Sequence, residues 1–458
     1  MVLNPLITVY ITNHNYDAYL KQSIESVLHQ SFQNFELLII DDGSTDNSKD
    51  IIEQYRAHEK ISVIYQQNKG LNITNNIAMR AAKGKYLMRL DADDFLEKEA
   101  LAEMSDVLES DDELGLIFPD YYYVDAEGNR TGIEKRHNFE KEVSLYDQPA
   151  HGACTMIRLE FLRNLGGYNE SFTCQDGYDL WIKFITHHKV SNINIPLFSY
   201  RRHGQNLTTN EDKILKTRKQ IKSAFVDEHF KSPATLAIIP VRNTFIGNIN
   251  LPLFEINGKS LIEQKVESAL ESKKLKRVII SSADEEILGY ITNKFRDKNK
   301  VGIIQRPKAF AEKNQSLNDT IKQALQFELE NDRAYEAIMT LAIEYPFLNA
   351  ETIDEAVDTL TLFKSDAVLS VRPDNRLYYQ HNGKSLNPIL NQEKFTKLER
   401  EALYKGVGGI VLSTMDNFHK HGNMSEGRIS HVVVDQKSAF GIFSSFDFEI
   451  YQNLRKSL

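Results

Sequence analysis

At 458 residues the chain is too long for one ordinary hydrophobic core, and its length predicts two or three domains. Its formal net charge of -9 argues against a nucleic-acid-binding protein, whose surface is usually basic. The two cysteines, Cys154 and Cys174, form neither a disulfide framework nor a thiolate metal site, which fits a reducing cytoplasm. No stretch approaches the ~20 apolar residues of a membrane span. We therefore expect a cytoplasmic protein with, at most, peripheral contact to the inner membrane face.

Three strand–loop–helix units are predicted at the start of the chain. The strands cover residues 6–11, 35–40 and 62–65, and the helices cover 19–28, 47–56 and 74–82. Small polar residues at 41–46 and 68–70 form turns between them. Repeated right-handed units of this kind build a parallel sheet, in which ligands bind beyond the carboxyl ends of the strands.

An apolar strand predicted at 86–90 ends in three carboxylates, Asp91, Asp93 and Asp94. Residues two apart in an extended chain face the same side, so Asp91 and Asp93 can converge on one point. Carboxylate oxygens suit Mg²⁺ or Mn²⁺, which usually complete their coordination with substrate phosphates. The pattern indicates a nucleoside diphosphate held through a metal. The alternative is a turn in which Asp94 caps a helix that begins near Glu97.

The next segments complete a first domain, predicted at 1–232. We expect strands at 114–118, 152–158 and 193–200, helices at 101–109 and 213–230, and at 174–184 a loop that enters an amphipathic helix. Residues 121–146 are predicted to be polar and irregular, on the side of the acceptor. A second α/β domain is predicted at 235–458. Its strands are expected at 237–240, 277–281, 301–304, 337–341, 367–371, 409–412 and 431–434, and its helices at 261–271, 317–330 and 350–360.

Seven ordered motifs give residues 5–205 a resemblance to the family 2 glycosyltransferases, which share the nucleotide-binding GT-A fold. They are TVYITNHN (8–15), SVLHQS (26–31), LIIDDGSTD (38–46), NKG (68–70), DADD (91–94), QDGYDLW (175–181) and YRRH (200–203). The resemblance implies that the nucleotide is bound by Thr12, His14, Asn15, Asp42, Asn68, Gly70 and Asp91. A carboxylate such as Asp42 accepts hydrogen bonds only, which suits the N3–H of uracil or thymine and favours a UDP-sugar, without excluding cytosine. The alternative for Asp42 is a helix cap, which Ser44 or Asp46 can also supply.

The resemblance further implies a base, Asp176, and a metal site formed by Asp91, Asp93 and His203. Asp179 is the rival base, because QDG stands where many relatives have Glu-Asp and the register is open by a residue or more. A helix N-cap is the alternative role for Asp179, and a structural role is the alternative for His203. The Mg²⁺ or Mn²⁺ would act as a Lewis acid on the departing diphosphate, and a single displacement would invert the anomeric centre.

The second domain resembles the cytidylyltransferases that make CMP-sugars. The likeness rests on AIIPVR (237–242), GKSLI (258–262), RP (306–307), YKGVGG (404–409) and DF (447–448). Three departures stand against activity. The loop 243–251 has no lysine, Gly441 and Phe443 align with the metal-binding aspartates, and IEYP (343–346) brings a carboxylate towards the phosphates. We expect that this domain has lost nucleotidyl transfer and forms a homodimer.

The fold class is therefore predicted as α/β, with two Rossmann-like nucleotide-binding domains. The predicted function is an inverting, metal-dependent glycosyltransferase. It would move a sugar from a nucleotide-sugar donor to a glycan or lipid-linked glycan acceptor in bacterial surface polysaccharide synthesis. Two alternatives stay open, a bifunctional enzyme that also makes its CMP-sugar and a non-catalytic scaffold.

Overall fold

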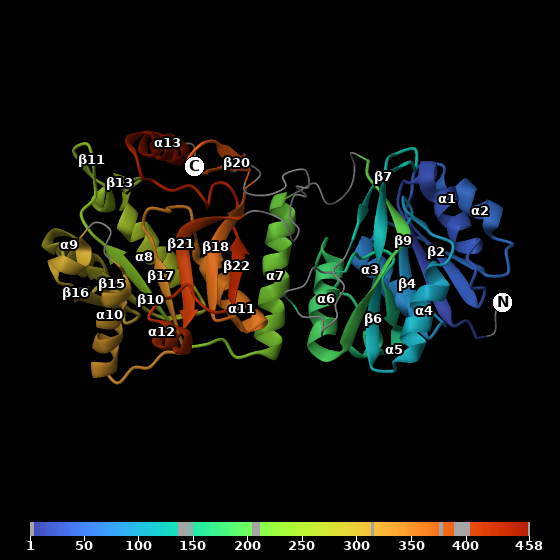
Figure 1. The fold of residues 1–458 in the computed structure, drawn as a ribbon, viewed down its shortest axis with the longest axis horizontal. Helices are drawn as coiled ribbons and strands as arrows, with labels where there is room; N and C mark the ends of the chain where they lie inside the picture. The colour runs from blue at the N-terminus through green and yellow to red at the C-terminus, as the bar shows by residue number, and fades with distance from the viewer. Residues whose placement is uncertain are drawn as a thin grey trace. The chain divides into compact units, whose positions relative to one another are not determined.

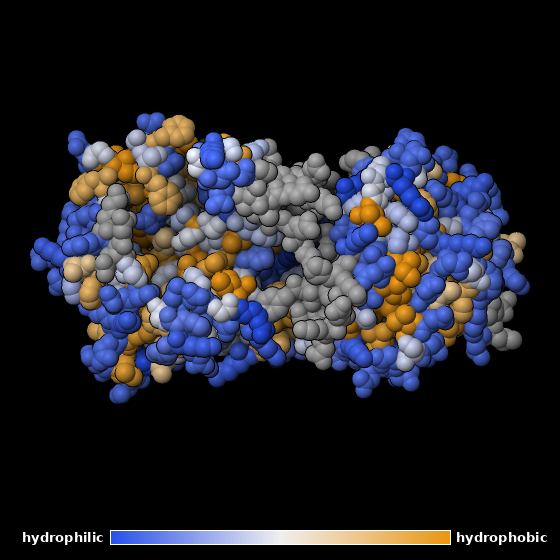
Figure 2. Space-filling view, in the orientation of Figure 1, coloured by the Kyte–Doolittle hydropathy of each residue, from blue (hydrophilic) through white to orange (hydrophobic). Residues whose placement is uncertain are grey.

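The computed structural model describes residues 4–135, 145, 150–203, 211–312, 316–374, 379–388 and 404–456. The chain forms two compact units, Met1–Ile221 and Lys222–Leu458, whose elements are labelled in Figure 1. Both units are α/β, as predicted for the fold class. The visible surface of each is mostly hydrophilic, with small hydrophobic areas (Figure 2). None of the helices in the described ranges combines the length and apolar composition that crossing a membrane requires.

The first half of unit 1 follows the predicted strand–loop–helix order. Four parallel strands form it, in the spatial order β3-β2-β1-β4. They are β1 (Ile7–Asn13), β2 (Phe35–Asp42), β3 (Ile61–Gln66) and β4 (Tyr86–Asp91), with helices α1 (Asp17–Leu28), α2 (Ser48–Tyr55) and α3 (Leu71–Ala81) between them. The register pairs Asn13 with Asp41 and Thr12 with Asp91. The polar residues that end these strands therefore meet at one edge of the sheet.

The second half of unit 1 extends the same sheet in the order β4-β8-β6-β9-β5. The strands are β5 (Phe95–Leu96), β6 (Leu114–Val124), β7 (Arg130–Glu134), β8 (Met156–Arg158) and β9 (Lys189–Arg201), and the helices are α4 (Ala100–Ser110), α5 (Leu159–Asn164) and α6 (Asp176–His187). Strand β8 is antiparallel to both β4 and β6, and β9 is parallel to β6. Strands β6 and β9 consequently end at the same edge as β4.

The prediction of an irregular segment at 121–146 was wrong for its first part. Residues 121–124 continue β6, and 130–134 form β7 against it. Tyrosines at 121, 122 and 123 favour extended backbone, because aromatic side chains pack well on a pleated surface. Residues 136–144 and 146–149 of the predicted segment lie outside the described residues.

Arg201, at the end of β9, is buried and connects three segments of unit 1. Its main-chain N–H donates to Asp94 Oδ1 and its Nε to Asp93 O, both at 2.8 Å. Its Nη1 donates to the backbone O atoms of Asp125 and Ala126, and its Nη2 donates to Gln22 Oε1 on α1. The loop after β4 is thus fixed against α1 and the β6–β7 turn by one side chain.

Unit 2 is built on a sheet in the order β16-β15-β10-β17-β21-β18-β22. Its strands are β10 (Thr235–Val241), β15 (Leu275–Ser282), β16 (Val301–Gln305), β17 (Ala337–Leu341), β18 (Ala367–Pro373), β21 (Tyr404–Thr414) and β22 (Ile429–Val433). Its helices are α8 (Leu261–Glu271), α9 (Glu285–Phe295), α10 (Asn318–Glu330), α11 (Ala350–Phe363), α12 (Met415–His421) and α13 (Ser445–Lys456). Short hairpins join β11 (Phe245–Ile246) to β12 (Ile249–Asn250), β13 (Glu255–Ile256) to β14 (Lys259–Ser260), and β19 (Tyr379–His381) to β20 (Leu386–Pro388).

Helix α7 (Glu211–His229) contains the division between the units. Within unit 1, Thr217 lies with its Oγ1 3.2 Å from Cys174 Sγ. Within unit 2, Lys222 forms a buried ion pair of 2.6 Å with Glu355 on α11. The compact units divide inside α7, whereas the sequence placed the domain boundary after it, at 232–235.

Lys265, on α8, is a buried lysine whose amino group meets main-chain carbonyls. Its Nζ donates to the backbone O atoms of Tyr345 at 2.8 Å and Leu348 at 3.2 Å. Burial lowers the pKa of Lys265 to about 7, against an opposing effect of Glu344. A neutral amine has two N–H donors, which matches the two carbonyl acceptors.

We expect the free energy of unfolding of unit 2 to rise with pH above about 7 because of Lys265. An ordinary lysine has a pKa of ~10.4, so between these values the unfolded chain holds a proton that the folded chain has released. The expected slope approaches ~1.4 kcal/mol per pH unit, and below pH ~7 both states are protonated and the slope disappears. Urea unfolding of the full chain, followed by circular dichroism between pH ~7.5 and ~9.5, measures it.

The variant Lys265→Met is expected to lose this pH dependence, because it has no amine to titrate. Lys276→Met is the matched control, since Lys276 is exposed on β15. Equal pH dependence in the wild type and in Lys265→Met would show that the amine stays charged when buried.

Candidate active site

Loops after β1, β2 and β3 are joined by side-chain hydrogen bonds at the carboxyl edge of unit 1. Asn15 has a positive φ of 62°, and its Oδ1 accepts the N–H of Thr45 at 2.7 Å. His14 is exposed, with Nδ1 2.9 Å from the backbone O of Asp42 and Nε2 3.1 Å from Asn68 Nδ2. The structure thus brings together most of the residues predicted to bind the nucleotide.

Asp42 is buried and holds the turn that begins α3. Its Oδ1 accepts from Gln66 Nε2 at 2.7 Å and from the N–H of Lys69 at 2.8 Å. Its Oδ2 accepts the N–H of Gly70 at 2.9 Å, and Gly70 adopts a φ of 88° that side chains rarely allow. Helix α2 has its own acceptor in Asp46, whose Oδ1 accepts the N–H of Ser48 at 3.0 Å. A carboxylate has about four positions at which it can accept a hydrogen bond. Asp42 uses three of them, so one position remains for a ligand.

Asn13 was not singled out from the sequence. It is buried at the end of β1, and its Nδ2 donates to Asp41 Oδ1 at 2.8 Å and to Ser44 Oγ at 3.0 Å. The sequence held one indication of this role. Asn13 and Asp41 both follow predicted neighbouring strands, and a buried amide at such a position needs hydrogen-bond partners. Asn13 fixes the β1 loop to the β2 loop.

Arg89 was also missed, because the sequence analysis treated 86–90 as one apolar run. Tyr86, Met88 and Leu90 enter one core cluster, so Arg89 points to the other face of the sheet, like Asp91. Its Nε lies 2.9 Å from Asp91 Oδ1, and its Nη1 forms an ion pair with Asp176. Burial disfavours the charge of Arg89, but Asp176 and Asp91 raise its pKa above the usual range. The buried guanidinium joins two predicted site residues from distant parts of the chain.

Asp91 is thereby shared between two neighbours. Thr12 Oγ1 donates to Asp91 Oδ1 at 3.3 Å, and the Arg89 guanidinium balances its charge. This places Thr12 and Asp91 beside each other at the ends of adjacent strands, as the register requires.

Asp93 and His203 form a close pair at the same edge. Asp93 Oδ2 lies 2.9 Å from His203 Nε2, and the imidazole lies near Tyr16 and Tyr19, with ring centroids 5.7 and 5.5 Å away. The alternative role of Asp94 as a helix cap does not hold, because its Oδ1 accepts from the N–H of Arg201 and Glu99 is the residue that precedes α4. The tertiary contact to β9 takes the carboxylate away from the helix.

The donor set beside β4 fits a divalent cation completed by a substrate. Burial and then Asp91 raise the pKa of Asp93, and burial, Asp93 and Asp91 raise that of Asp94. Asp94 Oδ2 is buried without a hydrogen-bond partner. Across the described ranges, no group of three or more His, Cys, Asp or Glu side chains is arranged to hold a metal ion. Mg²⁺ commonly takes only one or two protein carboxylates together with substrate phosphates, which Asp93 and His203 can accommodate.

The two candidate bases have different partners. Asp176 is the first residue of α6, and a Cβ added to Gly152 would lie 3.2 Å from its Oδ2. Asp179 pairs with Lys183 one turn further along α6, at 2.8 Å; burial raises its pKa, against the effect of Lys183. The alternative role of Asp179 as a helix N-cap does not hold, since Gln175 is the N-cap residue of α6. Through Arg89, Asp176 is the carboxylate connected to Asp91.

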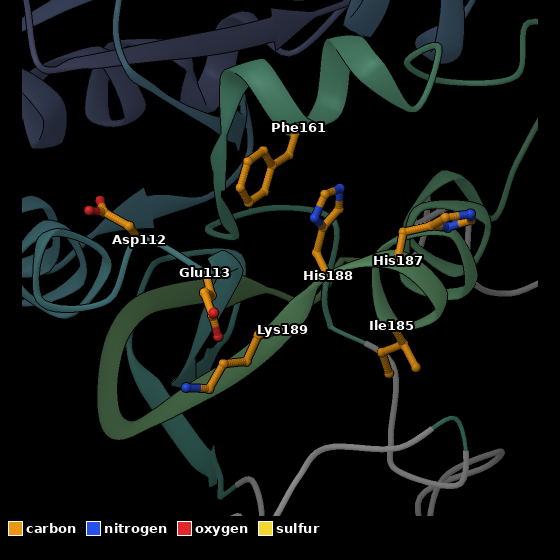
Figure 3. Close-up of a pocket in the computed structure, with 7 residues that line it drawn as sticks. All are labelled: Asp112, Glu113, Phe161, Ile185, His187, His188 and Lys189. Carbon is orange, nitrogen blue, oxygen red and sulfur yellow. The ribbon is translucent and has the colours of Figure 1, made fainter.

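A surface hollow of about 520 Å³ lies at the other edge of the sheet. Figure 3 shows it at the amino ends of β6 and β9, where the rings of Phe161 and His188 stack with centroids 4.1 Å apart. Asp112, Glu113 and Lys189 also line it. Because it opens away from the carboxyl ends, it is not part of the candidate active site.

Comparison with known proteins identifies both halves of the chain. The family model described as "Glycosyl transferase family 2" matches residues 8–166, and the one described as "Cytidylyltransferase" matches 236–404. Chondroitin synthase of Escherichia coli is 32% identical over 221 residues, which cover 46% of this chain and 31% of that protein. An uncharacterized glycosyltransferase of Methanocaldococcus jannaschii is 30% identical over 206 residues, which cover 43% of this chain and 71% of the relative.

Among solved structures, residues 1–349 of S. aureus TarS match with 18% identity and a TM-score of 0.41, over 49% of this chain and 66% of that one. The chain spans about a third of the length of the chondroitin synthase it matches. The matched ranges agree with the predicted resemblances in both units. Through residues 8–166 the chain belongs to glycosyl transferase family 2, and it continues with a cytidylyltransferase-like segment.

Proposed function

We propose that unit 1 is an inverting, metal-dependent glycosyltransferase that moves a sugar from a UDP-sugar to a glycan acceptor. The observation that carries the proposal is the pairing of Asp93 with His203 beside Asp91, which Arg89 joins to Asp176. A donor-binding pair and a candidate base are thus held at one edge of the sheet. This edge is where ligands of such sheets bind.

The nucleobase would lie against the loops after β1, β2 and β3. Asp42 has one acceptor position left, which suits a ring N–H such as N3–H of uracil. The exposed ring of His14, held by Asn68 and by the backbone of Asp42, offers a face to the base. Both groups are fixed before a ligand arrives, which lowers the entropic cost of binding.

Asp93 and His203 would hold Mg²⁺ or Mn²⁺ together with oxygens of the donor diphosphate. When bound, the metal supplies Lewis-acid stabilisation of the leaving group. Arg89 offsets the charge of Asp91, which leaves Asp93 as the carboxylate that would face the cation, while burial and the neighbouring carboxylates raise the pKa of Asp94 and favour its neutral form. Arg201 keeps these two residues in place through the backbone O of Asp93 and the carboxylate of Asp94.

Asp176 would take the proton of the acceptor hydroxyl as that oxygen attacks the anomeric carbon. The ion pair with Arg89 fixes the position of its carboxylate at the start of α6. Attack from the side opposite to the diphosphate inverts the anomeric centre in one displacement. Asp179 is a weaker candidate because its ion-pair partner, Lys183, lies on the same helix, whereas Asp176 is joined through Arg89 to Asp91.

Unit 2 would serve assembly, as a homodimer, and not nucleotidyl transfer. The loop after β10 is tied to the segment after β15, since the main-chain N–H of Asn243 donates to Asp284 Oδ2 at 2.8 Å and its Nδ2 donates to Asp284 Oδ1 at 3.1 Å. Phe443, which aligns with a metal-binding aspartate, is 67% exposed and cannot ligate an ion. Formation of a CMP-sugar from CTP by the full chain would instead favour the bifunctional alternative.

The wider role we propose is the synthesis of a bacterial surface polysaccharide, with a glycan or lipid-linked glycan as acceptor. Support comes from the 32% identity to a chondroitin synthase over 221 residues. A lipid-linked acceptor would bring the protein to the inner membrane face through peripheral contact from the cytoplasm.

Nucleotide release from UDP-, GDP-, dTDP- and CMP-sugars with Mn²⁺ tests the donor and the metal. UDP-sugars are expected to react, and a chelator is expected to stop the reaction. Asp93→Asn should lower the rate ~100-fold or more, because it removes a ligand charge from the cation. Asp112→Asn is the matched control, as Asp112 is 91% exposed at the far edge of the sheet. Undiminished activity in Asp93→Asn would contradict the role of Asp93 as a metal ligand. No nucleotide release from any donor would favour the non-catalytic scaffold.

The two candidate bases can be separated by kinetics. Asp176→Asn is expected to lower kcat by ~10²–10⁴ with little change in the KM for the donor, since one positioned base contributes about this much. Asp179→Asn should lower kcat less than ~10-fold, because it loses an ion pair within α6 and no contact to the reacting atoms. The reverse order of effects would make Asp179 the base.

A further inference from the structure

Five aromatic side chains gather at the carboxyl ends of β6 and β9, and we name them the aromatic cluster: Tyr121, Tyr123, His151, Phe198 and Tyr200. The parallel register places Tyr121 opposite Phe198 and Tyr123 opposite Tyr200. The ring centroids of His151 and Tyr200 are 4.8 Å apart, as are those of Tyr121 and Phe198. Tyr123, His151 and Tyr200 are partly exposed, so the cluster presents ring surface to solvent.

The aromatic cluster adjoins both halves of the candidate active site. Tyr200 lies three positions before His203, which pairs with Asp93. His151 directly precedes Gly152, which packs against Arg89 and Asp176. A molecule lying on the cluster is therefore next to the candidate base and next to the site of the donor diphosphate.

Arg202 stacks on this cluster and has a free charge. Its guanidinium lies 3.6 Å from the centroid of the Tyr123 ring, and its main-chain N–H donates to Val124 O at 2.9 Å. The side chain is exposed, and within the described part of the chain no carboxylate forms an ion pair with it. Stacking restricts the guanidinium and leaves its N–H groups available for an anion.

Arg130 shows the same stacking with its charge already matched. Its guanidinium lies 3.7 Å from the centroid of the Tyr122 ring, while its Nη2 lies 3.1 and 3.0 Å from the two carboxylate oxygens of Glu97. The two arginines thus differ in one respect, the presence of a carboxylate partner. That difference marks Arg202 as the arginine that can bind an anionic ligand.

We propose that the aromatic cluster and Arg202 bind the acceptor glycan, and that this acceptor carries an anionic group, a carboxylate or a phosphate. The inference rests on the proposed transferase function and names the class of its acceptor. The apolar face of a sugar ring packs on aromatic side chains, and a guanidinium binds a carboxylate or phosphate through paired hydrogen bonds. Arg202 thus selects the acceptor, while Asp176 acts on its hydroxyl.

Titration of the full chain with three disaccharides, without donor, tests this proposal. One ends in a hexuronate, the second is the same sugar with its carboxylate reduced to an alcohol, and the third ends in a hexose 6-phosphate. At least one anionic sugar is expected to bind ~10-fold or more tightly than the neutral one, as charged hydrogen bonds contribute about this much. The stronger of the two anionic sugars identifies carboxylate or phosphate as the recognised group.

Arg202→Gln is expected to reduce the binding of the anionic sugar to the level of the neutral one. Arg130→Gln is the matched control and should leave binding unchanged, because Glu97 occupies that guanidinium. Equal or undetectable binding of all three sugars, or the same loss in both variants, would overturn the proposal. The titration uses no donor, so it is independent of the nucleotide-release assay. Selective binding of an anionic sugar without nucleotide release from any donor would support the acceptor subsite and contradict the transferase function.

Discussion

The arrangement of the active edge depends on one buried guanidinium. Arg89 pairs with the half-buried Asp91 on its own strand and with the buried Asp176 at the start of α6, so its positive charge compensates two carboxylates that lie near each other. Removing one partner would leave a charge unpaired away from water, which lowers the free energy of unfolding. The position of the candidate base is therefore coupled to the end of β4. The same pairing leaves Asp93, with His203, as the carboxylate that can turn to a cation. One side chain thus connects the end of β4 to the proposed base.

Several features of this edge could be predicted from the sequence. Apolar runs that end in polar residues locate the strand ends, and parallel pairing brings Thr12, Asp42 and Asp91 together whatever the details of packing. Arg89 could not be found this way. Its partner Asp176 lies far along the chain, and no local pattern indicates that the two side chains meet. The alternative of a helix cap at Asp94 could not be excluded from the sequence for the same reason, since its hydrogen-bond donor, Arg201, lies far along the chain.

Unit 2 repeats the strand arrangement of unit 1 with different residues at its strand ends. Its parallel strands also end in a polar edge, yet Asn243 and Asp284 satisfy each other there. Family resemblance predicted the fold of this unit, and the residues at its strand ends are the basis of our proposal that it does not transfer nucleotides. The buried amine of Lys265 donates hydrogen bonds to main-chain carbonyls of the segment after β17. No local sequence pattern indicated this contact.

The most direct test of the account is whether a divalent cation and a nucleoside diphosphate bind together at Asp93 and His203. Electron paramagnetic resonance of Mn²⁺ mixed with the full chain would follow the loss of the free-ion signal, with and without UDP. The account predicts that UDP increases Mn²⁺ binding to the wild type and that this increase disappears in His203→Ala. Mn²⁺ binding that does not respond to UDP, or that responds equally in the variant, would contradict it.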